Sequence, residues 1–523
     1  MTTAEKLVGK IPEGHVLRIQ TTPPSKKTGI IKTFSFNATA TTQEQEFQTN
    51  NWDTVFAVRV ADVNNAIING MTKHPEKYPQ NWSAEVKKSL TSNDYSGNGT
   101  FGVWQVTLGG SGTILRMKVP VKNCTIIANS ANISVESATA YIEVHLKFLS
   151  YNNNENNKVL VVKTTSSSST ETAVLVQSVI LDNVDPQNND INNALKNLLQ
   201  NWFNDNLIQF THVFAAVDLN ITAAAGEGFQ WLLPTTTSYA YIDGTTENNS
   251  VLAILSMVNG NSTDITVQSV EAGAIPKGSR ACLNISKQLF IKEMILPNMK
   301  HVFEKSPADN FITTHNGMEV EIKDSVALNS IFHAGLYYYP TLTKFTMTIN
   351  VDTIEMYMFI HIPISPGIDA YVETTGYYRI KLVTAEDGTQ KMTYEVAKEP
   401  LTKTWHEVAV WVEAVEGIAD IILAVVTIVI SDTLAAIKHA VIRVVLAIVV
   451  GGIAATIAVV LEKIPEWIAD GVPKDLPSLD GLVDNAFKAT KWTDSGDFEL
   501  TALGFNGAFQ MSGDPHFNEK QNP

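Results

Sequence analysis

An apolar segment near the C-terminus, "RVVLAIVVGGIAATIAVVLEK", occupies residues 443–463. It holds 18 consecutive uncharged residues between Arg443 and Glu462. As an α-helix, 18 residues reach about 27 Å, slightly less than a bilayer hydrocarbon core of about 30 Å. A segment of this length and apolarity has to be covered by lipid or by protein. Its hydropathy alone does not distinguish the two.

Small residues recur along this segment. Ala447, Gly451 and Ala455 are spaced every four residues, which would allow a second backbone to approach closely. The pair Gly451 and Gly452 is a weak point in a helix, because glycine loses more backbone freedom on folding than any other residue. These four positions are therefore the candidates for membrane contact or helix packing.

A second apolar helix is expected immediately before this segment. Between residues 405 and 438 the polar side chains recur at nearly helical steps and would form one narrow stripe: Glu413, Glu416, Asp420, Thr427, Ser431 and Lys438. The β-branched run at 425–430 opposes a helix, although packing can override propensity. Together the two helices predict an apolar hairpin over 418–461 that turns near Lys438 to Arg443.

The rest of the chain favours cover by protein, or reversible contact with a membrane, over a permanent span. The start, "MTTAEKLVGKIPEGHV", lacks the apolar core of a secretory signal. Residues 444–461 are the one candidate span, and the mean hydropathy of the chain is +0.01. We therefore expect cytoplasmic synthesis without a signal peptide, with any later release and extracellular action by another route.

Length, charge and cysteine content narrow the class of protein. The 523 residues suggest about three domains, or two large ones. A net charge of −15 repels phosphate backbones, so nucleic acid is not expected as a partner. Cys124 and Cys282 lie far apart in sequence and make neither a disulfide framework nor a metal-type spacing.

Strand and helix periodicities alternate along the chain. Period-two patterns predict strands that include 141–149, 354–362 and 498–511. Three-four spacing predicts helices at 59–71, 190–203 and 286–303, the last kinked or stopped by Pro297. A hairpin is expected to turn at Asp387 and Gly388. The recurring order of helix and strands suggests a duplicated α+β unit.

Three consecutive tyrosines stand in "LYYYP", residues 336–340. A strand would direct Tyr338 to one face, and Tyr337 and Tyr339 to the other. The side chains suit an aromatic anchor at a membrane or a partner protein. Structural packing is the preferred interpretation.

Sequence motifs of catalysis are absent. The chain contains no Walker-type phosphate loop, HExxH zinc motif, nucleophile elbow or paired-cysteine metal motif. The segment "GGSGT" at 109–113 is typical of a hairpin turn between strands. We therefore predict no catalytic residue, no metal ligand and no cofactor, and a protein that is not an enzyme.

Five segments carry a resemblance to a known family. They are "NWDTVFAVRVADVNNAI" (51–67), "WQVTLGGSGTILRMKVPVK" (104–122), "FTHVFAAVDLN" (210–220), "KQLFIKEMILPNM" (287–299) and "AGLYYYPTLTKF" (334–345). They resemble the clostridial P-forty-seven (P47) proteins and, more loosely, their OrfX neighbours, which are encoded beside neurotoxin and insecticidal toxin genes. That family is similar in fold to the tubular lipid-binding (TULIP) proteins, in which a curved antiparallel sheet wraps around a long helix.

The resemblance implies an elongated α+β protein of two TULIP-like units of curved antiparallel sheet wrapped around long helices. The residues themselves add an apolar helical segment near the C-terminus, where the chain departs from the family pattern. The expected divisions are 1–50 for an N-terminal extension, 51–280 for the first unit, 281–404 with 485–515 for the second, and 405–484 for an apolar helical insertion. No catalytic residue is carried over from the family.

Apolar faces of the predicted elements suit two roles. A packed core and a tunnel for acyl chains both need soft, apolar side chains, and the core is the preferred interpretation. The tunnel candidates are Leu195, Leu198, Trp202, Leu289, Met294, Met356, Met358 and Ile360.

Three functions remain open. The first is a non-enzymatic accessory protein of a bacterial toxin system, insecticidal toxins included, that binds a lipid or another apolar ligand. The second is a membrane-inserting component that uses the apolar hairpin 418–461. The third is a scaffold that binds sister proteins of the same gene cluster. The ligand, the target organism and the oligomeric state do not follow from the sequence.

Overall fold

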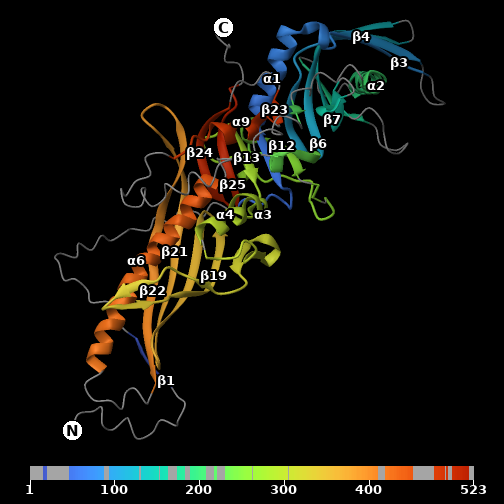
Figure 1. Cartoon of the computed structure of the whole chain (residues 1–523). Helices are drawn as coiled ribbons and strands as arrows, with labels where there is room; N and C mark the ends of the chain where they lie inside the picture. The colour runs from blue at the N-terminus through green and yellow to red at the C-terminus, as the bar shows by residue number, and fades with distance from the viewer. Residues whose placement is uncertain are drawn as a thin grey trace, which may run out of the picture. The chain divides into compact units, whose positions relative to one another are not determined.

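The computed structural model (Figure 1) describes residues 16–20, 46–87, 94–128, 131–151, 154–162, 173–182, 189–207, 217–220, 230–258, 260–261, 263–303, 305–409, 419–451, 476–488, 490–492 and 498–516. The chain divides into two compact units. The first unit comprises residues 46–286, 480–503 and 508–523. The second unit comprises residues 1–45, 287–479 and 504–507.

Most of the described chain is antiparallel sheet, with few helices. The sheet of the first unit runs in the order β23-β10-β8-β7-β6-β5-β11-β12-β2-β13-β25-β24, with β3 beside β4, β4 beside β6 and β9 beside β7. Its strands are β2 Thr54–Arg59, β3 Asn81–Val86, β4 Tyr95–Phe101, β5 Gln105–Gly112, β6 Ile114–Ala128, β7 Ala131–Tyr151, β8 Asn154–Val162, β9 Val174–Leu181, β10 Val217–Asn220, β11 Pro234–Ile242, β12 Val251–Val258, β13 Ala281–Ile285, β23 Thr490–Trp492, β24 Glu499–Asn506 and β25 Ala508–Asp514.

Among the described residues of the first unit, three segments are α-helices: α1 Val60–Lys73, α2 Asn189–Asp205 and α9 Asp480–Lys488. The predictions at 59–71 and 190–203 are therefore confirmed. Helix α2 buries Leu195, Leu198 and Trp202. Leu198 packs directly on the backbone of β4, where a Cβ added to Gly97 would lie 2.6 Å from the Leu198 Cδ1 atom. Glycine therefore permits the close approach of helix and sheet at this point.

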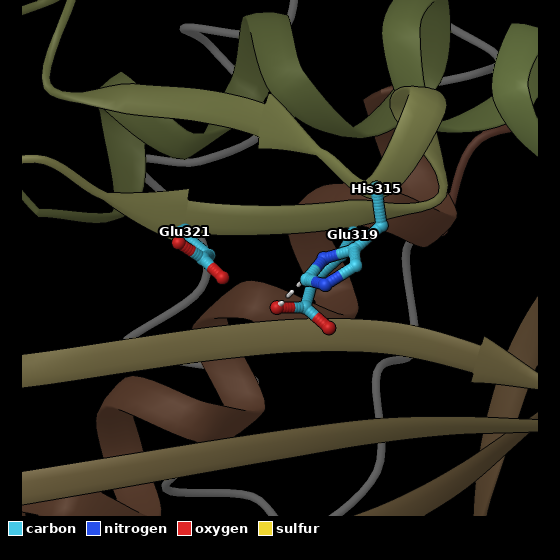
Figure 2. A group of neighbouring side chains, drawn as sticks. All are labelled: His315, Glu319 and Glu321. Atoms are coloured by element: carbon cyan, nitrogen blue, oxygen red, sulfur yellow. Dashed lines mark ion pairs between the residues drawn. The ribbon is translucent and has the colours of Figure 1, made fainter.

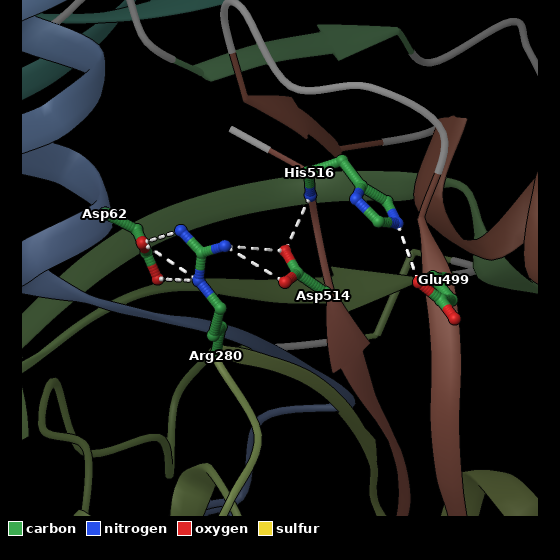
Figure 3. A network of polar contacts seen from close by, with 5 residues as sticks. All are labelled: Asp62, Arg280, Glu499, Asp514 and His516. Atoms are coloured by element: carbon green, nitrogen blue, oxygen red, sulfur yellow. Dashed lines mark hydrogen bonds and ion pairs between the residues drawn. The ribbon is translucent and has the colours of Figure 1, made fainter. Parts of the chain in front are cut away.

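The C-terminal strand β25 is tied to the first unit by an ion-pair network (Figure 3). Arg280, just before β13, donates hydrogen bonds to the carboxylates of Asp62 in α1 and Asp514 in β25, the latter with Nη1 and Oδ2 2.9 Å apart. The hydrogen bonds to Asp62 hold the pKa of Arg280 above its ordinary value. Beyond β25, the Nε2 atom of His516 lies 2.9 Å from Oε2 of Glu499.

The observed division differs from the predicted boundaries. Residues 485–515 were expected in the second unit, but β25 pairs with β13 of the first unit, from Ala281 opposite Gly513 to Ile285 opposite Phe509. Likewise, 405–484 is not a separate insertion, because residues 405–479 belong to the second unit. Periodicity shows which face of a strand is buried and does not show which strand lies beside it.

The second unit contains a sheet in the order β1-β22-β21-β20-β19-β15-β14, with β16 beside β19, and a separate hairpin of β17 and β18. Its strands are β1 Val16–Gln20, β14 Phe311–Thr314, β15 Glu319–Ile322, β16 Val326–Ala327, β17 Ile331–His333, β18 Leu336–Tyr338, β19 Thr341–Asn350, β20 Thr353–Ser365, β21 Ile368–Thr384 and β22 Gln390–Ala409. As predicted, β21 and β22 turn at Asp387 and Gly388, where Gly388 has a φ of +85°.

The helix predicted over 286–303 is present in three parts. They are α3 Lys287–Phe290, a π-helical turn Ile291–Ile295 and α4 Leu296–Val302. Pro297 lies in the first turn of α4 and does not end the helix there. The wider π-helical turn ends two residues before Pro297, which has no backbone N–H to donate.

One long helix, α6 Ala419–Gly451, contacts α4, the π-helical turn, β17, β21 and β22 in the second unit (Figure 1). It runs unbroken through Lys438 to Arg443, so the predicted hairpin turn at this place is wrong. Residues 438–443 contain no glycine or proline, and isolated polar residues do not break a helix. Gly452 and Ala455 lie outside the described residues.

The two parts of α6 differ in burial. Along residues 424–443 one stripe is buried: Val426, Val429, Ile430, Thr433, Ile437 and Val441. The predicted polar stripe is confirmed where it is described, since Thr427, Ser431 and Lys438 are exposed. Glu413 and Glu416 lie outside the described residues. From Val444 to Val449 every side chain is buried, so protein surrounds the helix at this end.

Candidate functional site

The hairpin of β17 and β18 carries a cluster of exposed apolar side chains. Its strands pair in the register Ile331–Tyr338, Phe332–Tyr337 and His333–Leu336. Ala334 and Gly335 connect the strands with φ angles of +52° and +81°, the signs required by a type I′ turn. The inner face, Ile331 and Tyr338, is buried against the second unit. The side chains of the other face therefore point to solvent.

Four large apolar residues of this hairpin are exposed, and we call them the aromatic hairpin: Phe332, Leu336, Tyr337 and Tyr339, each 60–63% exposed. Phe332 and Tyr337 lie on the outer face, whereas Leu336 lies beside the turn on the face of Tyr338. The rings of Phe332 and Tyr337 contact each other with centroids 4.8 Å apart. Within the described residues, every phenylalanine, tyrosine or tryptophan that is classed as exposed lies in this hairpin or next to it. Such a concentration is typical of an interaction surface.

The sequence around the aromatic hairpin has no acidic residue. Neither aspartate nor glutamate occurs between Asp324 and Asp352, although the chain as a whole has a net charge of −15. An anionic surface that approached this segment would therefore meet no negative side chain from it. The lack of negative charge and the exposed apolar area thus both favour a partner whose surface is anionic and partly apolar.

A pocket of about 180 Å³ lies within the same unit. Its walls come from the end of α4, from residues 327–329 that lead into β17, and from one face of α6. The apolar lining consists of Val302, Phe303, Ala327, Leu328, Ala436 and Ala440. Asn329 and three basic residues complete the lining: Lys305, His439 and Arg443.

Arg443 is the polar residue of the pocket that most clearly indicates the kind of ligand the pocket would bind. It is the last of four pocket-lining α6 positions spaced at helical steps, after Ala436, His439 and Ala440. Within the described residues, its buried Nε atom has no hydrogen-bond partner. By contrast, the Nζ atom of Lys305 donates to the carbonyl oxygen of Leu328 at 3.0 Å. A buried donor without an acceptor is costly, and the positive charge of Arg443 beside the pocket favours an anionic group there.

The alternation predicted for "LYYYP" is confirmed. Tyr338 is 3% exposed, whereas Tyr337 and Tyr339 are 60% and 63% exposed. The preferred interpretation, structural packing, therefore holds for Tyr338 alone. The sequence analysis missed Phe332 and Leu336, although a two-residue Ala-Gly turn between two short, largely apolar strands was a usable hairpin signal.

The eight predicted tunnel residues are all buried, between 0% and 5% exposed. Leu195, Leu198 and Trp202 lie in the first unit, where the Trp202 ring contacts Phe101 with centroids 4.7 Å apart. Leu289, Met294, Met356, Met358 and Ile360 lie in the second unit. None of the eight lines the pocket at Arg443. Their role in a tunnel stays a prediction.

The candidates for membrane contact or helix packing are partly described. Ala447 is 1% exposed, which makes it a packing position in this structure. Gly451 is the last residue of α6, and Gly452 and Ala455 lie outside the described residues. By length and composition, residues Ala424–Val449 of α6 could cross a membrane, and a third of its most apolar stretch is buried.

Comparison with known proteins identifies the family. The sequence profile of the OrfX-like family, described as "Protein OrfX2/OrfX3/P47", matches residues 49–513. The chain belongs to this family. The resemblance carried by the five sequence segments is therefore confirmed.

Relatives of the chain cover nearly its full length. It is 25% identical to Protein OrfX3 of Paraclostridium bifermentans, over 90% of this chain and 99% of the relative. Identity to Protein OrfX3 of Clostridium botulinum (strain Kyoto / Type A2) is 26%, over 89% and 98%. The structure of P47 from Clostridium botulinum A2 superposes with a TM-score of 0.61 at 18% identity, over 90% of this chain and 99% of P47. This last likeness shows the fold alone.

Proposed function

We propose that this OrfX-like protein is a non-enzymatic accessory component of a bacterial toxin system, and that it binds lipid through the aromatic hairpin and the pocket at Arg443. The observation that carries the proposal is the gathering of four exposed large apolar side chains on one hairpin: Phe332, Leu336, Tyr337 and Tyr339. Family membership supports the toxin-system context, because OrfX and P47 proteins are associated with toxin gene clusters. An insecticidal role and TULIP-like units remain part of this proposal.

The aromatic hairpin suits the boundary between lipid headgroups and acyl chains. Tyrosine has an apolar ring and a polar hydroxyl, and it is enriched at this boundary in membrane proteins. The type I′ turn presents Phe332 and Tyr337 as directly opposed strand partners. Burial of apolar surface contributes roughly 25 cal/mol per Å², so a few partly inserted side chains give reversible attachment.

The pocket suits an anionic headgroup or the end of an acyl chain. Its volume of about 180 Å³ is below the 300–1,000 Å³ that is usual for pockets of drug-sized ligands. An entire lipid would therefore extend beyond it. Arg443, His439 and Lys305 place positive or ionisable donors beside an apolar wall, and this combination matches an amphiphile with a negative head.

Vesicle flotation tests the proposal. Leu336→Ser removes one apolar side chain from the aromatic hairpin, and Leu401→Ser makes the same change in β22 of the same unit, where Leu401 is 59% exposed. Losing about 1 kcal/mol of interfacial burial should weaken vesicle binding about fivefold for Leu336→Ser. Leu401→Ser should bind as the unaltered protein does. Equal binding by both variants, or no binding by the unaltered protein, would refute the proposal.

Bound apolar ligand is tested separately. The purified protein is extracted with organic solvent, and the extract is analysed by mass spectrometry. Recovery of a lipid at near-stoichiometric amount, and its loss from Arg443→Gln, supports the pocket. A protein that carries no lipid but floats with vesicles would limit the function to surface attachment.

A second candidate function rests on α6. Its length and apolarity over Ala424–Val449 suit a membrane span, which would require α6 to leave β21 and β22. Dye release from liposomes measures this activity. A charged residue at Ala435, which is exposed, should abolish release if α6 inserts, and should leave release unchanged if it does not.

Sister proteins of the same cluster are the remaining proposed partners. The aromatic hairpin could equally contact a protein, since exposed aromatic residues are enriched at protein interfaces. Pull-down with sister proteins, repeated with Leu336→Ser and Leu401→Ser, distinguishes this from lipid binding. We also propose that the protein is made in the cytoplasm and acts outside the cell after its release.

A further inference from the structure

A group of metal-ligand side chains lies in the second unit and shares no residue with the proposed lipid site. It consists of His315, Glu319 and Glu321 (Figure 2). One ligand atom from each residue lies within 4.8 Å of the others. The sequence analysis predicted no metal ligand, because the three residues match no metal motif in the linear sequence.

The local fold brings these residues together. Strands β14 and β15 form a hairpin in which Thr314 pairs with Glu319 and Ile312 pairs with Glu321, so the two glutamates share one face of the sheet. His315 follows β14 directly. Figure 2 shows its imidazole beside the Glu319 carboxylate, with His315 Nδ1 and Glu319 Oε1 3.7 Å apart.

Two neighbouring carboxylates repel each other when both are ionised. Glu319 and Glu321 share one face of the sheet, so their carboxylates lie close together. A divalent cation between the three side chains would relieve this repulsion, because it contacts both carboxylates at once.

The set of donors indicates the kind of ion. Zn²⁺ accepts imidazole nitrogen and carboxylate oxygen, whereas Mg²⁺ and Ca²⁺ prefer oxygen ligands alone. Bonds of about 2.1 Å place neighbouring ligands of a tetrahedral ion about 3.4 Å apart. The separation of 3.7 Å between His315 Nδ1 and Glu319 Oε1 is already close to this value.

We propose that His315, Glu319 and Glu321 bind a divalent transition metal ion, with Zn²⁺ as the ion that best fits the donors. Three protein ligands leave coordination positions for water or for a donor from another molecule. The His315 side chain is 69% exposed, so the ion is open to solvent on this side. Binding ties the turn after β14 to β15 and is independent of lipid attachment.

Isothermal titration of the untagged full chain with ZnCl₂ tests the site. His315→Ala removes the nitrogen ligand at an exposed position and should bind one equivalent less than the unaltered protein. The matched control is His333→Ala in β17, a histidine of the same unit outside the group. It should retain the full stoichiometry. Equal stoichiometry for the unaltered protein and His315→Ala would overturn the proposal, as would the absence of zinc binding by the unaltered chain.

Cobalt spectroscopy gives a second readout. Co²⁺ replaces Zn²⁺ and shows absorption bands that report its coordination. We expect bands that are weakened by Glu321→Gln, that are lost in His315→Ala and that persist in His333→Ala. Circular dichroism of each variant without metal checks its fold. A spectrum unchanged by both ligand substitutions would assign the metal to other residues and refute the site.

Discussion

The two parts of α6 are both largely apolar, but they differ in their polar content and in their surroundings. Residues 424–438 bury one stripe and expose the other faces, including Ile428, which is 40% exposed. Residues 444–449 are buried on every side. Hydropathy alone would treat both parts as a membrane span or as a core. The difference shows that neighbouring elements decide the burial of an apolar helix.

The partly exposed part of α6 is also the part that lines the pocket. Ala436 and His439 are exposed, while Arg443 stands at the boundary with the fully buried end. We infer that 444–449 anchors the helix in the second unit, whereas 424–443 presents a surface for a ligand. Pairs of variants test this comparison, because each pair makes the same substitution in two different environments of α6.

The largest effect is expected from a charge in the buried part. Ile448→Asp places an unpaired carboxylate at a side chain that is 1% exposed, and it should destabilise the protein by more than about 4 kcal/mol or prevent folding. Ile428→Asp should cost less than about 1 kcal/mol. Urea unfolding measures both. Similar small losses would show that protein does not enclose 444–449.

A smaller difference in the free energy of unfolding is expected between the buried and the half-buried faces of residues 424–443. Val429→Ala removes two methyl groups from a side chain that is 0% exposed, which costs about 2 kcal/mol through lost burial and the cavity left behind. Val425 is only half-buried, so Val425→Ala should cost roughly half as much or less. Thermal unfolding compares the two variants. Equal costs would contradict the single buried stripe.

Binding to anionic vesicles should depend on the charge of Arg443, which stands at the boundary between the two parts of α6. Arg443→Gln removes a pocket donor, and we expect binding to anionic vesicles to weaken by about 1 kcal/mol, or about fivefold. Lys438→Gln removes the same charge from an exposed position of α6 that does not line the pocket. Flotation at several salt concentrations measures both. A larger loss for Lys438→Gln would place the anion site elsewhere on α6.

The smallest effect is a pH dependence of stability near α6. His406 lies in β22, which α6 contacts, and its side chain is 4% exposed. Burial lowers the pKa of His406, while the unfolded chain titrates near 6.5. Between the two values the unfolded chain binds more protons, so the free energy of unfolding falls as pH decreases below about 6.5.

His406→Gln should reduce this loss of stability on acidification. The control His439→Gln removes an exposed histidine of α6 and should leave the pH dependence unchanged. Melting temperatures between pH 7.5 and 5.5 provide the measurement. An identical slope for His406→Gln and the unaltered protein would show that another group causes the acid sensitivity.

Much of the local structure was predictable from the sequence. In β20, the residues Met356, Met358 and Ile360 are buried as the period-two pattern required. Helix α2 and the turn at Gly388 also occur where spacing and turn chemistry placed them. These features depend on residues close together in the chain, and therefore a single sequence carries their signal.

The candidate sites were much less predictable. "LYYYP" revealed the alternation of the tyrosines, but not that Phe332 would lie opposite Tyr337 on an exposed face. The pairing of β14 and β15 brings His315 near Glu321. The packing of α6 near α4 places Arg443 and Lys305 in the lining of one pocket. Each site combines residues from separate elements, so no local sequence pattern predicts it.

The sequence by itself determined the family, the alternation of the long strands and the helical character of residues 419–451. Its ordered motifs and periodicities are properties of the linear chain. Only the tertiary structure decided that β25 joins β13, that α6 continues through Arg443, and that protein covers 444–449. These outcomes depend on hydrogen bonds and packing between distant residues, for which hydropathy holds no information.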